Sequence, residues 1–108
     1  MKHSLRHSDI DIILNTGELC VSTYALRIHR KLKSLRYPRF SVIVPKYIGP
    51  AVVRNYVKRK IRAAFALISS EKNYDLVILV RKGGADCHLE TYIKQLKKAY
   101  EPTIKKHS

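Results

Sequence analysis

The chain has 108 residues, 45% of them hydrophobic, which excludes a disordered tail and allows one domain with a core of its own. Lysine and arginine number 22 against 8 aspartates and glutamates, so the formal net charge is +14 and the chain attracts polyanions. Nucleic acid is the leading candidate partner and an anionic membrane surface is its rival, but no apolar run approaches the roughly 18 residues that span a bilayer.

The first predicted element is a short helix that begins near Ser8 and ends before Gly17. Its apolar side chains Ile10, Ile13 and Leu14 recur at helical spacing and form one face. Glycine is a natural residue just beyond the C-terminus of a helix. We therefore expect a short amphipathic helix at the start of the domain.

Two strands are predicted next. Between Cys20 and His29, apolar and polar side chains alternate as in a half-buried strand. Residues 30–38 are strongly basic and end in proline, so we expect a loop there. A second strand should run from Phe40 to Val44, because Pro45 ends the apolar run.

A long helix and a buried strand occupy the middle of the chain. Gly49 and Pro50 open the helix, since proline at an early helical position loses no hydrogen bond, and the helix should run to about Ser69. The stretch from Asp75 to Val80 is almost continuously apolar. Such a run is typical of a central strand that is covered on both faces.

The last predicted element is a helix after the break at Gly83 and Gly84, with Asp86 as a candidate cap. The order of helix, two or three strands, helix, strand and helix predicts the α+β class: a two-layer α/β sandwich with a small central sheet packed by helices. Residues 1–108 should form a single RNA-binding domain. The apolar stripe of the last helix has helical spacing and consists of Leu89, Tyr92, Ile93, Leu96 and Tyr100.

The long helix carries a run of basic side chains without any acid. Like charges at i,i+4 spacing repel, and solvated helical faces usually mix both signs. On a helical wheel an apolar arc with Val53, Val57 and Ile61 can bury while the basic arc stays in water. Arginine can bind phosphate through two hydrogen bonds, so we interpret the arc as a phosphate-contacting face; the alternative is an ordinary solvated face. The basic residues are Arg54, Lys58, Arg59, Lys60 and Arg62.

The sequence of this helix resembles the signature of the bacterial ribonuclease P protein component. The shared pattern from Lys46 to Phe65 is K-x-I-G-x-A-V-x-R-N-x-x-K-R-x-I-R-x-A-F, and residues 74–83 resemble the strand that follows it in that family, with its Arg-Lys pair. The resemblance covers most of the chain and is weak between residues 18 and 38. Tyr56 departs from the pattern, because the family usually has Arg-Asn-Arg where this chain has Arg-Asn-Tyr.

The resemblance implies a subunit of ribonuclease P that assists endonucleolytic removal of the 5′ leader of precursor tRNA, which gives mature tRNA 5′ ends. The catalytic RNA subunit would hold Mg²⁺ and perform the cleavage, and the polypeptide alone is not expected to be catalytic. The resemblance also implies a left-handed β-α-β crossover, opposite to the general rule. We expect a cytoplasmic protein, since no signal-peptide pattern occurs. Its implied partners are the catalytic RNA and precursor tRNA, with no membrane and no obligate protein partner.

Two sets of binding residues follow from the resemblance. The catalytic RNA would be contacted by Arg54, Asn55, Tyr56, Lys58, Arg59, Arg62 and Lys46. The single-stranded leader would lie in a cleft between the first helix and the sheet, lined by Ile10, Leu14, Tyr24, Phe40 and Tyr47. An exposed aromatic ring can stack on an unpaired base, but the three aromatic residues of this second set could equally belong to the core.

Other functions remain open in the sequence: a structural RNA-binding protein of the ribosomal type, or a DNA-binding protein with the basic helix in the major groove. A self-sufficient nuclease is disfavoured, because the eight acids are scattered and show no metal-binding motif. We accordingly predict no catalytic and no metal-binding residue in the polypeptide. Cys20 and Cys87 are far apart and fit reduced thiols at ordinary positions.

Overall fold

The computed structural model describes residues 7–32, 39–68 and 74–101 and confirms the predicted α+β class. Helices and strands follow one another in the expected order, with two single-turn 3₁₀ helices between them. The elements are α1 (His7–Thr16), β1 (Glu18–Ser22), β2 (Leu26–Leu32), β3 (Phe40–Ile43), η1 (Lys46–Ile48), α2 (Ala51–Ala66), β4 (Tyr74–Val80), η2 (Lys82–Gly84) and α3 (Leu89–Lys98).

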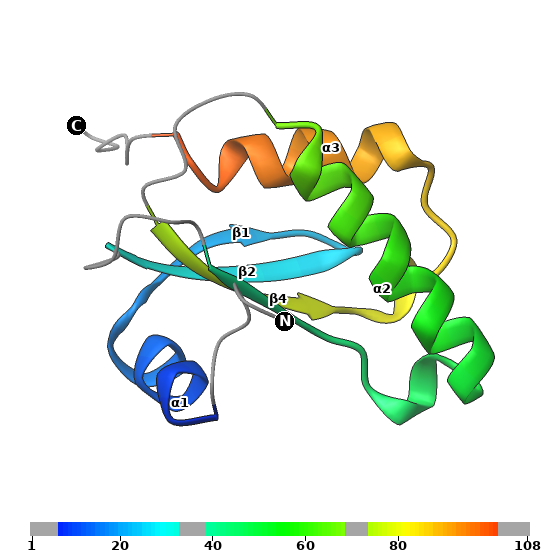
Figure 1. Cartoon of the computed structure of the whole chain (residues 1–108), viewed down its shortest axis with the longest axis horizontal. Coiled ribbons are helices and arrows are strands. Elements are labelled where there is room, and N and C mark those ends of the chain that lie inside the picture. Colours follow the sequence, from blue (N-terminus) through cyan, green and yellow to red (C-terminus); the bar gives the residue numbers. More distant parts are fainter. Residues whose placement is uncertain (1–6, 33–38, 69–73, 102–108) are drawn as a thin grey trace.

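A four-stranded sheet in the order β1-β2-β4-β3 forms the centre of the molecule. β2 is antiparallel to β1 and to β4, whereas β3 is parallel to β4. α2 and α3 cover one face of the sheet and α1 lies on the other (Figure 1). β4 is the predicted central strand: Leu76, Val77 and Ile78 are fully buried, with Val77 in a small cluster under α1 and the other two in the main core.

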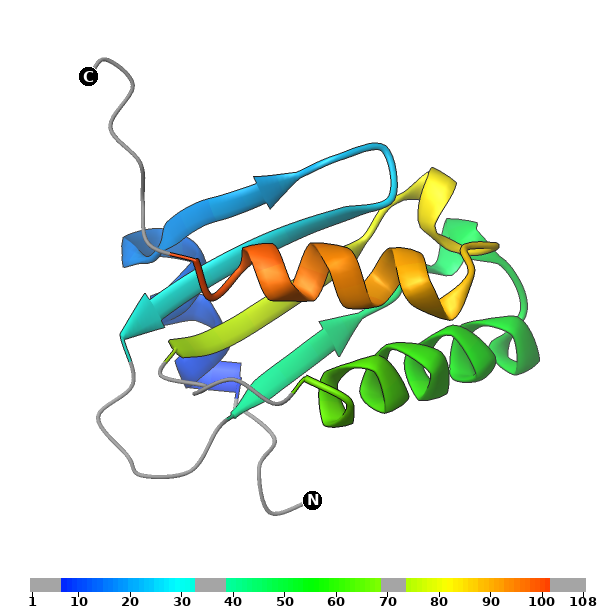
Figure 2. The ribbon, with the colours of Figure 1, turned by 90° about the horizontal axis from the view of Figure 1, so that it is seen from above.

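The connection from β3 through α2 to β4 is left-handed. Figure 2 looks onto the sheet from the side of α2, with β3 and β4 pointing to the right and β4 above β3. A right-handed connection would place β4 below β3 in this view. The chain therefore has the uncommon hand that the family resemblance implied.

The single strand predicted from Cys20 to His29 is instead two strands joined by a tight turn. The Thr23 hydroxyl accepts hydrogen bonds from the backbone N–H groups of Ala25 and Leu26, both at 3.1 Å, and the Thr23 N–H donates to the Leu26 carbonyl at 2.9 Å. A threonine side chain that bonds nearby backbone groups favours a turn over an extended strand. The alternation of side chains did not reveal this reversal.

The loop predicted for residues 30–38 is wrong at its start, because Arg30 and Leu32 belong to β2 and pair with Leu76 and Tyr74 of β4. The basic composition suggested a loop, but the strand simply alternates between its two faces. Residues 33–38 lie outside the described residues. The predicted cap Asp86 is also wrong, since α3 begins at Leu89 after His88.

Gly17 brings the end of α1 into close contact with β2. A Cβ atom at this position would lie 2.5 Å from the Ile13 carbonyl oxygen and 2.7 Å from that of Arg30. Only a glycine fits between two backbones at such separations. This contact fixes α1 on its face of the sheet, where Ile13 is buried against Val77.

Candidate nucleic-acid interface

Five side chains form a polar strip along α2, which we call the basic strip: Arg54, Asn55, Lys58, Arg59 and Arg62. Asn55, Arg59 and Arg62 are exposed, and the other two are half-buried. On the opposite side of the helix Val57 and Ile61 are fully buried in the main core. α2 thus combines a core-facing side with a cationic side, as the sequence predicted.

The cations of α2 have no acidic partner among the residues that the structure describes. The ion pairs found there join Arg30 to Glu18 at 3.0 Å and Arg39 to Asp9 and Asp75 at 3.4 and 2.7 Å. All of them belong to the sheet, its flanking residues and α1 rather than to α2. The basic strip therefore keeps its positive charge at the surface, where it can attract phosphate.

Arg54 is oriented by the turn that precedes α2. Its Nε donates a hydrogen bond to the Gly49 carbonyl at 3.0 Å. Gly49 has φ of 154°, a conformation that favours glycine, and a Cβ there would lie 3.3 Å from the side chain of Val53. The Gly49 of the sequence signature thus places a carbonyl that holds Arg54 at the start of the strip.

Lys60, the fifth cation of the run, does not belong to the basic strip. Its Nζ donates to the Cys87 carbonyl at 2.6 Å and lies 5.2 Å from the Tyr56 ring centre and 5.7 Å from that of Tyr92. Lys60 therefore links α2 to the segment before α3. Tyr56, half of whose surface is exposed, accompanies Lys60 on this flank, so the structure separates this predicted RNA contact from the arginines.

Three more of the predicted contacts lie at the end of the sheet where β3 and β4 terminate. Lys46 and Tyr47 are exposed in η1, just before α2. Tyr24 is 69% exposed in the β1–β2 turn and packs against Gly83, where a Cβ would lie 2.4 Å from its ring. These three residues are available to a partner, which the sequence alone did not establish for the tyrosines.

The residues predicted to line a leader cleft are not all on one face of the sheet. Ile10 and Leu14 of α1 pack with Ile13, Val77 and Ile43 on the α1 side. Phe40 instead packs in the main core on the α2 side, with its ring stacked on Phe65 at 4.1 Å between centres. Because alternate residues of a strand face opposite ways, Phe40 shares its face with Val42 and not with Ile43.

Sequence reasoning missed three basic side chains on the α1 side of β2, which we call the β2 row: Arg27, His29 and Lys31. Arg27 and Lys31 are exposed, whereas Leu26 and Ile28, which alternate with them, are fully buried in the main core. His29 Nδ1 is buried and has no hydrogen-bond partner among the described residues. Burial, and secondly the charge of Arg27, lower the pKa of His29. Alternation of basic and apolar residues was the available signal.

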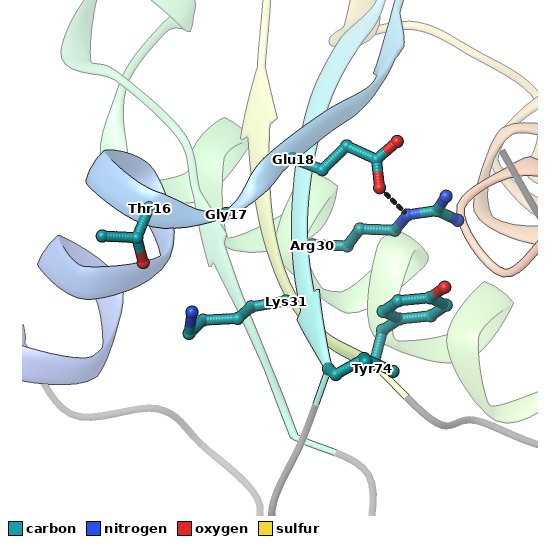
Figure 3. Close-up of a pocket in the computed structure, with 7 residues that line it drawn as sticks. Thr16, Gly17, Glu18, Arg30, Lys31 and Tyr74 are labelled. Carbon is teal, nitrogen blue, oxygen red and sulfur yellow. Dashed lines mark hydrogen bonds and ion pairs between the residues drawn. The ribbon is translucent and has the colours of Figure 1, made fainter. Parts of the chain in front are cut away.

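A pocket of about 320 Å³ lies where α1 meets the sheet (Figure 3). Arg30 in its wall is occupied by the fold: Nη1 donates to the Ala99 and Glu101 carbonyls at 2.8 and 2.6 Å, and the guanidinium lies 4.4 Å from the Tyr74 ring centre. Arg30 points toward α3, whereas Lys31 points toward α1. The pocket is lined by Thr16, Gly17, Glu18, Arg30, Lys31, Leu32 and Tyr74.

The described residues contain no cluster of three or more histidine, cysteine or acidic side chains that could hold a metal. Cys20 and Cys87 are free thiols that donate weakly to the carbonyls of Ile28 and Gly83. Burial raises the pKa of Cys20 to about 11, so this thiol stays protonated at neutral pH. Among the described residues, no helix combines the length and the apolar composition that crossing a membrane requires.

Comparisons of the sequence and of the structure with known proteins point to one family. The family model for ribonuclease P matches residues 2–103. The ribonuclease P protein component of Rhodococcus opacus is 32% identical over 85% of this chain and 80% of its own length, and that of Clostridioides difficile is 30% identical over 91% and 88%. The structure of the RNase P protein from Thermotoga maritima superposes with a TM-score of 0.77 at 23% identity, covering 92% of this chain and 98% of that one. The chain belongs to the ribonuclease P protein family.

Proposed function

We propose that this protein is the protein subunit of a ribonuclease P holoenzyme and that the basic strip of α2 binds the catalytic RNA. The observation that carries the proposal is a strip with three arginines and no acidic partner among the described residues, in a chain of this family. Guanidinium groups bind phosphate through two parallel hydrogen bonds. The buried opposite side of α2 leaves one flank to a partner, which suits contact with an RNA backbone better than insertion into a groove.

The reaction assisted is hydrolysis of one phosphodiester bond of precursor tRNA. Water adds at phosphorus, the leader departs with a 3′ hydroxyl, and the mature tRNA keeps the 5′ phosphate. Mg²⁺ held by the RNA and substrate supplies the metal chemistry. The contribution of the polypeptide is binding and orientation: the basic strip holds the catalytic RNA, and the α1 side of the sheet, with Ile10 and Leu14, receives the 5′ leader.

Reconstitution with a bacterial ribonuclease P RNA tests this proposal. Binding of the catalytic RNA and cleavage of precursor tRNA labelled in its leader are both measured at limiting Mg²⁺. The proteins compared are the wild type, Arg59→Ala/Arg62→Ala and Lys94→Ala/Lys97→Ala. The last variant removes two exposed cations from α3 and is matched in charge. We expect stimulation by the wild type and the control, and roughly tenfold weaker RNA binding by the strip variant, since fewer RNA phosphates are then neutralised by the protein.

Three results would contradict the proposal. Binding of the RNA without any stimulation of cleavage would instead support a structural RNA-binding protein. Equal losses in the two double variants would show that only net charge matters. Cleavage of precursor tRNA by the polypeptide without RNA would place the catalytic groups in the protein.

A further inference from the structure

Arg39, the residue before β3, joins α1 to the sheet. Its Nη2 and Nε donate hydrogen bonds to the two carboxylate oxygens of Asp75 in β4, at 2.7 and 3.3 Å, and its Nη1 donates to Asp9 of α1 at 3.4 Å. The Arg39 carbonyl accepts a hydrogen bond from the Leu76 N–H at 3.2 Å. Backbone and side chain therefore hold Arg39 on β4, while one nitrogen of the guanidinium reaches the helix.

The two carboxylates that Arg39 binds differ in their exposure. The side chain of Asp75 is 7% exposed and that of Asp9 is 29% exposed. A buried carboxylate that loses its cation destabilises a fold strongly, so the pair with Asp75 belongs to the core of the structure. A partly exposed ion pair contributes little to stability, because water can solvate its members when they separate. The contact with Asp9 can therefore restrict the position of α1 without being needed for folding.

Helix α1 has a second point of attachment at its other end. There Gly17 lies against the backbone of β2, with room for no Cβ atom, and Ile13 is buried on Val77 in the middle of the helix. Asp9 lies in the first turn of α1. A helix that is attached at one end can pivot about that end, whereas attachment at both ends fixes its direction over the sheet.

The attachment at Asp9 determines where the neighbouring Ile10 lies. Ile10 is half-buried beside Val77, and it forms one apolar surface with Leu14, which follows one turn later. The proposed function assigns this surface to the 5′ leader. Misplacement of binding groups by about 1 Å is enough to lose affinity, so the direction of α1 affects what the surface can bind.

We propose that Arg39 is a positioning residue for the 5′ leader: held on β4 by Asp75, it binds Asp9 and thereby fixes the N-terminal end of α1 over the sheet. The proposal rests on the proposed function for the identity of the ligand, but the attachment of α1 can be measured in the free protein. Arg39 acts through α1, and no contact between Arg39 and RNA is required.

The sign of one mutational effect separates positioning from electrostatics. A carboxylate near RNA repels phosphate, so the removal of Asp9 should strengthen leader binding if charge alone matters. If Asp9 instead holds α1 in place, its removal should weaken leader binding. Asp11→Ala is the matched control for Asp9→Ala, because Asp11 is an exposed acid of the same helix and its removal changes the net charge equally.

Amide hydrogen exchange in the free protein tests the attachment without RNA. We expect the amides of α1 to exchange about 3- to 10-fold faster in Asp9→Ala than in the wild type, because the N-terminal end of the helix opens more often. Exchange in Asp11→Ala should stay within about twofold of the wild type, and the amides of β4 should be unaffected in both variants. Circular dichroism confirms that each variant is folded.

Leader affinity is measured in the reconstituted holoenzyme, with Ca²⁺ replacing Mg²⁺ to suppress cleavage. Precursor tRNA with a leader of about ten nucleotides is compared with one that has a single leader nucleotide, and the ratio of the two dissociation constants isolates the leader. We expect Asp9→Ala to reduce the advantage of the long leader about 3- to 10-fold, with short-leader binding and assembly with the catalytic RNA unchanged. Asp11→Ala should retain the full advantage.

A double-mutant cycle assigns the effect to the contact between Arg39 and Asp9. Arg39→Lys keeps a cation for Asp75, but a single ammonium group lacks the fork that reaches both carboxylates. Arg39→Lys should therefore lower the leader advantage as Asp9→Ala does. The double variant should be no weaker than either single variant, because both changes remove the same contact.

Stronger binding of the long leader by Asp9→Ala would overturn the proposal, as would equal effects of Asp9→Ala and Asp11→Ala or additive losses in the double variant. If Arg39→Lys does not fold, the comparison of Asp9→Ala with Asp11→Ala decides. If the protein does not stimulate the catalytic RNA at all, the proposed function fails. The attachment is then judged by hydrogen exchange alone, and unchanged exchange of α1 in Asp9→Ala overturns it.

Discussion

Lys60 shows how a side chain in a basic run can belong to the interior of the fold. Its ammonium group bonds the Cys87 carbonyl and lies near two tyrosine rings. Lys60→Met keeps the apolar stem and removes the bond, so we expect a decrease of about 1–2 kcal/mol in the free energy of unfolding. Urea unfolding measures this, and the salt dependence of RNA binding should not change.

Arg59→Met is the control for Lys60→Met, because Arg59 is exposed in the same helix. This variant should unfold within about 0.5 kcal/mol of the wild type and lower the salt slope by roughly one unit. A reversed pattern, with Lys60→Met lowering the salt slope and keeping its stability, would show that Lys60 contacts RNA.

His29 should make the free protein less stable in acid. Burial and Arg27 lower its pKa in the folded state, so the unfolded chain, whose histidine has a pKa near 6.5, takes up the proton first. Above that pH both states are neutral and His29 has no effect. As the pH falls below about 6.5, the free energy of unfolding should decrease in the wild type relative to His29→Gln. Urea unfolding between about pH 7.5 and pH 5 measures the difference, and relative stabilisation in acid would mean that folding gives the imidazolium a partner.

Gly17 acts on a whole element, because it sets the distance between α1 and β2. A Cβ would lie 2.5 and 2.7 Å from two backbone oxygens, which cannot move as a flexible side chain can. We expect Gly17→Ala to lower the free energy of unfolding by about 1–3 kcal/mol, measured by urea or thermal unfolding. The exposed neighbour Asn15 serves as control, and Asn15→Ala should stay within about 0.5 kcal/mol of the wild type.

How much could be predicted differs from element to element. Helix α2 and strand β4 were predictable because their patterns are long and their apolar positions recur at one clear spacing. The β1–β2 turn was hidden, since it depends on hydrogen bonds of the Thr23 hydroxyl that alternation does not report. The last part of β2 was predicted as a loop, because its basic composition was given more weight than the alternation of its side chains.

The binding surfaces were likewise predictable in part. Arg59 and Arg62 could be placed in the basic strip, because the phase of one helix determines which side chains share a face. The face on which Phe40 lies could not, since it depends on which side of the sheet α1 packs. Relations within an element were readable from the sequence, whereas relations between elements required the fold.

At the scale of the whole molecule, the described ion pairs join the sheet, its flanking residues and α1, whereas the cations of α2 have no acidic partner among the described residues. Asp9, Glu18 and Asp75 are bound to Arg30 and Arg39. These ion pairs connect α1, β1, β2, β4 and the residue before β3. Lys58, Arg59 and Arg62 of the basic strip and Arg27 and Lys31 of the β2 row take no part in these ion pairs. They contribute to the net charge of +14 without an acidic partner among the described residues.

This division of charge predicts how the holoenzyme depends on Mg²⁺. Cationic side chains of the protein and Mg²⁺ both neutralise RNA phosphate. A protein with fewer cationic side chains at the RNA should therefore raise the Mg²⁺ concentration that gives half-maximal cleavage. We expect Arg59→Ala/Arg62→Ala to raise it several-fold and to approach wild-type rates at saturating Mg²⁺, with Lys94→Ala/Lys97→Ala close to wild type. A rate defect that persists at saturating Mg²⁺ would mean that the strip orients the RNA rather than merely screening its phosphate charge.

In the free protein, EDTA should leave the melting temperature unchanged, because the described residues provide no metal cluster. A melting temperature that falls with EDTA would reveal a metal bound by the polypeptide.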